Sequence, residues 1–152
     1  MPYANEGLVG EWAEMPQWPD HWAVNEDTDP ACPFKLATSP ARNFLNSSFN
    51  QTKTSVAREQ RPSALMHPDD AAALGLAEGD IVRLGNKRGE VRVHVAFSPH
   101  STRGVIVSEG LWDNRNFLDG RGINSLTSDR SVAPFGGAAF HDVRVWAKPD
   151  RD

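Results

Sequence analysis

The chain has 152 residues, 39% of them hydrophobic, which suits one domain with a buried core. Its formal net charge of −4 argues against a nucleic-acid partner, because neutralising phosphates needs a basic surface. The single cysteine, Cys32, excludes an internal disulfide. No apolar run approaches the roughly 20 residues that span a bilayer, so we expect no membrane insertion. The start of the chain, MPYANEGLVGEW, lacks the basic and apolar regions of a signal peptide.

Residues 1–33 differ from the rest in being rich in proline and tryptophan. The prolines disfavour a long helix or a central strand, so we expect an extended arm or linker. Trp12, Trp18 and Trp22 lie in this arm, and two interpretations of them stay open. Their rings cover part of the arm's own domain, or they pack on another domain or subunit, since exposed aromatic clusters usually mark contact surfaces.

Residues 65–95 are the best-defined stretch and predict a strand, a helix, a second strand and a hairpin. Pro68 suits the first helical position, and the two aspartates after it favour the positive end of the helix dipole. Gly75 suits a left-handed cap at the helix end. In residues 90–95 the valines alternate with polar residues, which predicts one buried strand face. The stretch contains no nucleophile, phosphate loop or metal site, and we interpret it as a scaffold.

Further strands are predicted at residues 34–38, 105–107 and 139–147. Two long polar loops, residues 39–62 and 111–140, carry many amide and hydroxyl groups that can donate and accept hydrogen bonds. Loops of more than about 15 residues without their own structure are usually functional or disordered. The whole pattern favours a closed or nearly closed small β-barrel with both loops at one end.

The residues alone predict no catalytic centre and no metal site. The histidines lack partners at the spacing of metal ligands. Ser47 and Ser48 lack the strand–turn–helix setting of a nucleophile elbow, and Cys32, between two prolines of the arm, is interpreted as inert. The two loops instead suit an extended polar ligand with ring amides and a pyrophosphate, which backbone N–H groups and hydroxyls can bind without strong positive charge.

Several strings in a fixed order carry a family likeness: SPARNFLNSSF, HPDDAAALGLAEGDIVRL with the NKRGEV hairpin, RGVIVSEGLW, INSLT and FHDVRV. Together they resemble the C-terminal molybdopterin-dinucleotide-binding domain of the molybdenum and tungsten oxidoreductases, the superfamily of dimethyl sulfoxide reductase, formate dehydrogenase and nitrate reductase. The likeness runs from about residue 34 to residue 148. It implies a mainly β fold, a double-psi β-barrel of the aspartate-decarboxylase-like kind, with one or two short helices. The arm would be residues 1–33, the barrel 34–148 and a tail 149–152.

The resemblance also implies a cofactor, bis-molybdopterin guanine dinucleotide, with molybdenum or tungsten held by other domains. The loop that follows the first strand approaches the cofactor in the family. Here that loop supplies Ser39, Arg42, Asn46, Ser47 and Ser48. The INSLT string is expected near a pterin or its phosphate, through Asn124, Ser125 and Thr127. Phe140 and His141 occupy the place where the family brings an aromatic or polar side chain to the cofactor.

The implied function is that of one domain of a larger oxidoreductase, with the remaining domains as its partners and no activity on its own. One cysteine cannot supply the family's iron–sulfur cluster, which lies in other domains. The alternative is a stand-alone small subunit that provides the same barrel in trans. A barrel decarboxylase would need a self-cleaving Gly-Ser pair, which the sequence lacks, and no ATPase sequence follows to suggest an ATPase-associated binding module. We expect a cytoplasmic location, or a periplasmic one if the parent enzyme carries an export signal.

Overall fold

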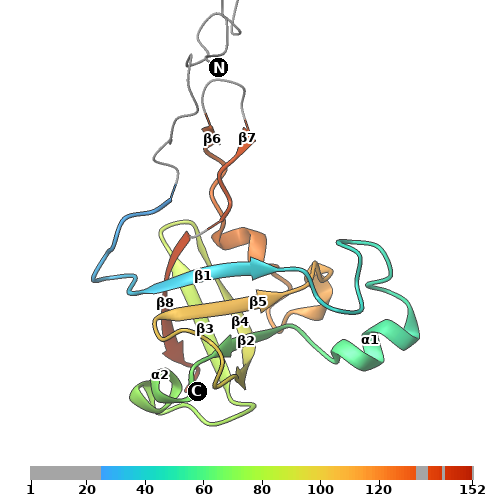
Figure 1. The fold of residues 1–152 in the computed structure, drawn as a ribbon, viewed down its shortest axis with the longest axis horizontal. Coiled ribbons are helices and arrows are strands. Elements are labelled where there is room, and N and C mark those ends of the chain that lie inside the picture. Colours follow the sequence, from blue (N-terminus) through green and yellow to red (C-terminus); the bar gives the residue numbers. More distant parts are fainter. Residues whose placement is uncertain (1–24, 133–136, 142, 152) are drawn as a thin grey trace, which may run out of the picture.

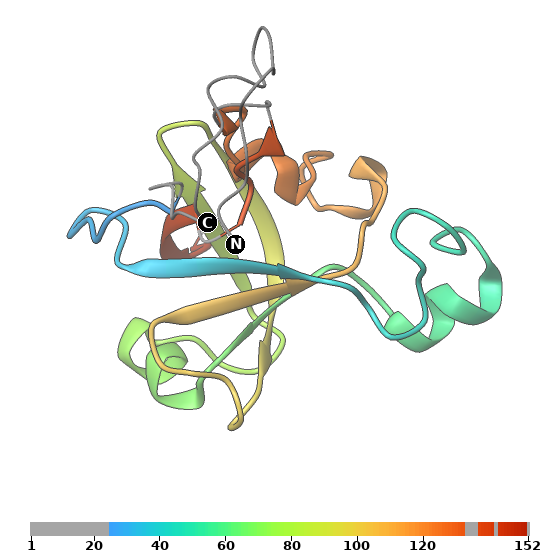
Figure 2. The same ribbon diagram turned by 45° about the horizontal axis from the view of Figure 1, so that its top comes forward.

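Six β-strands close into a barrel in the computed structural model, which describes residues 25–132, 137–141 and 143–151 (Figures 1 and 2). Around the barrel the strands follow the order β1-β5-β2-β4-β3-β8. Their bounds are β1 Phe34–Ser39, β2 Ser63–Met66, β3 Ile81–Asn86, β4 Gly89–Phe97, β5 Val105–Glu109 and β8 Val143–Pro149. The three tryptophans of the arm lie outside the described residues.

Two pairs of neighbouring strands run parallel, β1 with β5 and β2 with β4, and the other four neighbouring pairs run antiparallel. Parallel neighbours need crossover connections, and here each connection contains other strands of the barrel, since β2, β3 and β4 lie between β1 and β5 in the chain and β3 lies between β2 and β4. The predicted mainly β, double-psi barrel is confirmed. Because β1 and β5 are parallel and in register from Lys35 with Val105 to Ser39 with Glu109, the two long loops leave the barrel side by side.

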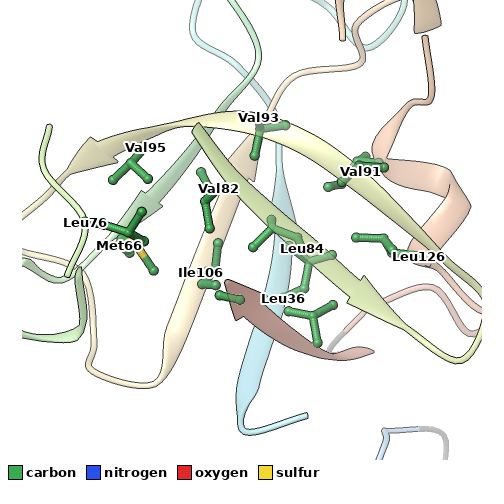
Figure 3. Packing of buried hydrophobic residues seen from close by; sticks show 14 of the residues in the cluster. Leu36, Met66, Leu76, Val82, Leu84, Val91, Val93, Val95, Ile106 and Leu126 are labelled. Atoms are coloured by element: carbon green, nitrogen blue, oxygen red, sulfur yellow. The ribbon is translucent and has the colours of Figure 1, made fainter. Parts of the chain in front are cut away.

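Alternating apolar residues fill the barrel, as the period of two predicts. Val91 of β4 is fully buried, and Val93 and Val95 are 2% exposed. They pack with buried residues of every other barrel strand (Figure 3): Leu36, Met66, Val82, Leu84, Ile106, Val143 and Val145. Among the described residues, five side chains of this core come from outside the strands: Ala71, Leu76, Phe117, Ile123 and Leu126. Leu126 is fully buried and lies beside Val91 in Figure 3.

The helix α2, Pro68–Leu74, has the predicted ends. His67 caps it by accepting a hydrogen bond at Nδ1 from the Asp69 N–H at 3.1 Å, and Gly75 is left-handed with φ +68°. Asp70 is buried and accepts a hydrogen bond from the Gly104 N–H at 2.6 Å, which ties α2 to the turn before β5. The carboxylate therefore has a structural partner. Among the described residues, no helix is long and apolar enough to span a bilayer.

Two predicted boundaries were wrong. Residues 39–62 are not structureless, because they contain the helix α1, Lys53–Glu59, which has no buried residue and so leaves no apolar period in the sequence. The last barrel strand begins at Val143 and not at residue 139, because Gly137–Ala138 (β7) pairs instead with Ser131–Val132 (β6). This small hairpin projects from the barrel in Figure 1. Phe140, placed in the strand by prediction, is 42% exposed.

Candidate functional site

The two long loops meet because their parent strands are neighbours. Where β1 and β5 end, the Gly110 N–H donates to the Ser39 carbonyl at 2.8 Å. Gly110 has φ +82°, and a Cβ added there would lie 3.0 Å from both the Ala41 Cβ and a ring carbon of Phe44. A larger residue would therefore be strained and would push the loops apart.

Side-chain contacts then fasten the loops to each other. The rings of Phe44 and Trp112 meet edge to face, with their centroids 4.7 Å apart. Asn50, 9% exposed, donates from Nδ2 to the Leu111 carbonyl at 2.8 Å. Gln51 adds a hydrogen bond to Asp113 at 2.9 Å. Figures 1 and 2 show the loop with α1 projecting beyond the ends of β1 and β5, next to the second loop.

A cavity of about 570 Å³ lies between the loops, within the usual range for small-molecule sites. Its wall comes from the end of β1, the first loop, the start of the second loop, the short 3₁₀ helix η3 (Ile123–Leu126), and the segment after β7. The lining residues are Thr38, Ser39, Pro40, Ala41, Asn46, Gly110, Leu111, Ile123, Asn124, Thr127, Ser128, Ala138, Phe140 and His141.

Six of the ten residues predicted for the site line this cavity: Ser39, Asn46, Asn124, Thr127, Phe140 and His141. The other four do not. Arg42 is exposed on the first loop, and Ser47 and Ser48 are exposed in a tight turn closed by two hydrogen bonds between Leu45 and Ser48. Ser125 lies against the β3–β4 hairpin, where its carbonyl oxygen would be 3.1 Å from a Cβ added at Gly89.

The groups that line the cavity are mostly neutral donors and acceptors. Within the described part of the chain, the Asn124 side-chain amide has no hydrogen-bond partner. Its backbone carbonyl accepts from the Thr127 hydroxyl at 3.0 Å, which fixes that side chain. The backbone of Asn46 is left-handed, with φ +52°, at the turn of the first loop. The rings of Phe140 and His141 pack against each other, with their centroids 4.3 Å apart. This wall can bind amides, hydroxyls and phosphate oxygens and can pack against a flat ring.

Sequence reasoning missed the backbone and apolar part of the wall, notably Ala41, Gly110 and Ile123. Only the order of strands in the barrel brings these residues together. Gly110 carried a partial signal, because glycine directly after a strand suggests a left-handed turn.

Comparison with known proteins identifies the family. The model of the family described as "Molydopterin dinucleotide binding domain" matches residues 34–144. The chain belongs to this molybdopterin dinucleotide-binding domain family.

Relatives and a solved structure agree with the family match. The domain is 36% identical over 122 residues to a probable oxidoreductase, YoaE, of Bacillus subtilis, covering 78% of this chain and 17% of that protein. It is 41% identical over 83 residues to dimethyl sulfoxide/trimethylamine N-oxide reductase of Rhodobacter capsulatus, covering 53% and 10%. The fold matches part of acetylene hydratase from Pelobacter acetylenicus with a TM-score of 0.63 at 19% identity, covering 78% of this chain and 18% of that one. The chain thus spans less than a fifth of these relatives.

The cavity fits part of such a cofactor. A pterin has a flat ring with amide-like edges, and the cavity offers the unpaired Asn124 amide and the adjacent rings of Phe140 and His141. Seven of the fourteen lining residues are apolar or glycine, and the lining contains no lysine or arginine. In the described ranges no group of three or more His, Cys, Asp or Glu side chains could hold a metal ion.

A second cavity of about 1060 Å³ is larger but fits the ligand less well. It lies between the arm (residues 25–32), the turn of the β3–β4 hairpin, β8 and residues 128–130. Its lining carries four acidic and four basic side chains, and none of the ten predicted site residues. Among these charges, Glu26 and Arg88 form an ion pair. Cys32 also lines this cavity, and burial raises the pKa of its thiol, so it stays protonated.

Glu26 is the central charge of this larger cavity. One carboxylate oxygen accepts from Arg88 Nη2, and the other accepts from the Arg144 N–H at 2.6 Å. Burial alone would raise the pKa of Glu26, but these two hydrogen bonds and the charges of Arg88 and Lys87 together lower it below its ordinary value. The ionised carboxylate is therefore the form that holds the arm on the barrel.

The contacts of the Glu26 carboxylate with Arg88 and the Arg144 N–H predict that the free energy of unfolding depends on pH. A carboxylate whose pKa is lower in the folded than in the unfolded state stabilises the fold above the unfolded pKa, and this stabilisation is lost as the pH falls through the folded pKa. Denaturant unfolding at a series of pH values should show Glu26→Gln less stable than the native chain at pH 7, with the difference shrinking below roughly pH 4.3. Asp27→Asn, at the exposed neighbouring carboxylate, is the control. A difference that stays constant down to pH 2.5 would contradict the role of the ionised carboxylate.

Proposed function

We propose that this domain holds one face of a bis-molybdopterin guanine dinucleotide in the cavity between its two loops. The proposal rests on the observation that distant segments of the chain meet at one cavity. Three segments far apart in the sequence, at residues 39–46, 124–127 and 140–141, supply six residues to one cavity wall. The family model is that of a molybdopterin dinucleotide-binding domain, and the donors in the cavity match this ligand. Both observations support the same proposal.

In this proposal the chain's own residues bind and orient, and the cofactor supplies redox chemistry at its metal when bound. The Asn124 amide would hydrogen-bond a pterin edge or a phosphate oxygen, and the Thr127 hydroxyl, whose proton goes to the Asn124 carbonyl, would accept from a pterin N–H. Ser39 and Asn46 would bind from the first loop, and Phe140 with His141 would pack against a ring. The Thr127 hydroxyl is held by the Asn124 carbonyl before the ligand arrives, so this group loses little ordering entropy on binding. The domain alone is expected to be catalytically inactive.

Arg42, Ser47, Ser48 and Ser125 stay predictions for parts of the cofactor that extend beyond the cavity. The proposed division of the chain is an arm at residues 1–33, the barrel at 34–148 and a tail at 149–152. The stand-alone subunit is less favoured, because the relatives contain the matching region within much longer chains. A cytoplasmic location, or a periplasmic one for an exported parent enzyme, completes the proposal.

Replacing Asn124 tests the proposed site. In the parent enzyme, Asn124→Ala should lower the molybdopterin and metal content after purification, because the lost amide hydrogen bond weakens binding by roughly two- to tenfold. Metal analysis and pterin fluorescence measure the content. Asn116→Ala is the control, since Asn116 is an exposed asparagine of the 3₁₀ helix η2, Asn114–Asn116, outside the cavity wall. Equal cofactor content in the native enzyme and the Asn124 variant would count against the site.

The open side of the cavity is also the proposed contact with the rest of the parent enzyme. The described chain has six large hydrophobic residues that are exposed, and five of them lie on the two loops or just after them. Leu45 and Phe49 are the most exposed, at 66% and 58%. Phe49 has φ +67°, a strained value for a bulky residue that the loop contacts maintain. An ordered apolar surface around an open site indicates that another domain covers both. The five residues are Leu45, Phe49, Leu111, Leu118 and Phe140.

This contact can be tested by limited proteolysis of the parent enzyme. The double variant Leu45→Ser and Phe49→Ser should release the domain faster than the native enzyme, because the loops lose apolar contact with the covering domain. Phe97→Ser is the matched control. Phe97 is exposed but ends β4 beside Glu78, away from both loops. Release at the same rate in both variants would contradict the proposed contact.

A further inference from the structure

We propose that the β3–β4 hairpin turn positions the cavity wall, with Asn86 and Arg88 holding η3 in place and Glu26 of the arm securing Arg88. The inference rests on the proposed function, because it assigns these three residues to the binding of the cofactor. From the sequence alone, Asn86 and Arg88 are predicted only as part of the scaffold and Glu26 only as part of the arm.

The wall segment η3 needs outside support. It is a single 3₁₀ turn of four residues, Ile123–Leu126, without a side-chain cap at its start. Such short turns are not stable by themselves. Yet η3 and the residue after it carry Asn124 and Thr127, two of the polar groups in the cavity. Their geometry depends on what fastens the turn to the barrel.

Two kinds of contact hold η3 on the barrel, one apolar and one polar, and both involve Leu126. Its side chain is fully buried in the barrel core (Figure 3). Its carbonyl oxygen accepts two hydrogen bonds from the hairpin turn, from Asn86 Nδ2 at 2.8 Å and from Arg88 Nη1 at 3.3 Å. The carbonyl at the end of the turn, which has no partner within so short a helix, is thereby satisfied.

Asn86 connects three elements. Besides Leu126, its Nδ2 donates to the Arg144 carbonyl of β8 at 3.1 Å. Its Oδ1 accepts from the Arg88 N–H at 2.9 Å, which shapes the hairpin turn itself. Gly89 completes the fit, because a Cβ there would come within 3.1 Å of the Ser125 carbonyl oxygen. The backbone of the hairpin therefore lies directly against η3.

The arm joins this network through Glu26. Its carboxylate pairs with Arg88 Nη2, on the same guanidinium that donates to Leu126, and it also binds the Arg144 N–H. Ser128, next to Thr127, lines both cavities. The two cavities thus share a wall, and the contacts of the arm on one side bear on the position of the binding groups on the other.

The test compares two arginine variants of the same hairpin in the 152-residue chain. Arg88→Met should increase amide hydrogen exchange at residues 123–127 and weaken binding of molybdopterin guanine dinucleotide, measured by fluorescence titration, by about tenfold. Arg83→Met is the matched control. Arg83 forms an ion pair with Glu90 across β3 and β4, with Nε to Oε1 at 2.7 Å, and it has no hydrogen bond to η3. It should leave both measurements at the native values.

Two further variants separate positioning from simple destabilisation. Asn86→Asp keeps the acceptor for the Arg88 N–H, removes the donor to Leu126 and Arg144, and places a negative charge beside both carbonyl oxygens, so its effects should be at least as large as those of Arg88→Met. Arg88→Lys keeps one donor and should restore part of the affinity. Equal exchange and affinity in Arg88→Met and Arg83→Met would overturn the inference. If the native chain fails to bind the dinucleotide while exchange at 123–127 still rises in Arg88→Met, the proposed function fails and the hairpin–η3 link stands.

Discussion

The parallel pairing of β1 with β5 is the constraint on which the site depends. In an antiparallel pair the chain would leave the two strands at opposite ends, and the two polar loops would be separated by the length of the barrel. Parallel pairing in register, Ser39 opposite Glu109, makes both loops start at one edge. Gly110 then lets their backbones approach, and Phe44, Trp112 and Asn50 fasten them together. The cavity is a consequence of this strand order.

In η3, Leu126 contributes both to the stability of the fold and to the position of the proposed binding groups. Burying a leucine side chain stabilises a fold by roughly 1.5–3 kcal/mol, and Leu126 supplies that burial from within the second loop. The same residue presents its carbonyl to Asn86 and Arg88. A segment with few internal hydrogen bonds is therefore held to the barrel by one buried side chain and two hydrogen bonds from the hairpin turn. The stretch that the sequence marks as scaffold, residues 65–95, supports the site through its hairpin turn as well as through its strands.

Elements with a local signal could be predicted from the sequence, and contacts that depend on the closed barrel could not. The helix α2 was predictable because Pro68, its following aspartates and Gly75 mark both ends. The helix α1 was not, because it buries no residue. Within the first loop, Asn46 faces the cavity while its neighbours Ser47 and Ser48 do not, since a tight turn points adjacent side chains in different directions. The family likeness selects the loop, and only the backbone conformation selects the residue.

The central claim is that the dinucleotide occupies the smaller cavity, where the Asn124 amide has no partner among the described residues, and not the larger one, where Glu26 and Arg88 already form an ion pair. The most direct test is NMR titration of the isotope-labelled 152-residue chain with molybdopterin guanine dinucleotide released anaerobically from a purified molybdoenzyme. The account predicts shifts that saturate at Ser39, Asn46, Asn124 and Thr127, with the arm residues Asp27 and Asp29 unaffected. Shifts centred on the arm and the turn at Lys87, or no shifts at all, would contradict it.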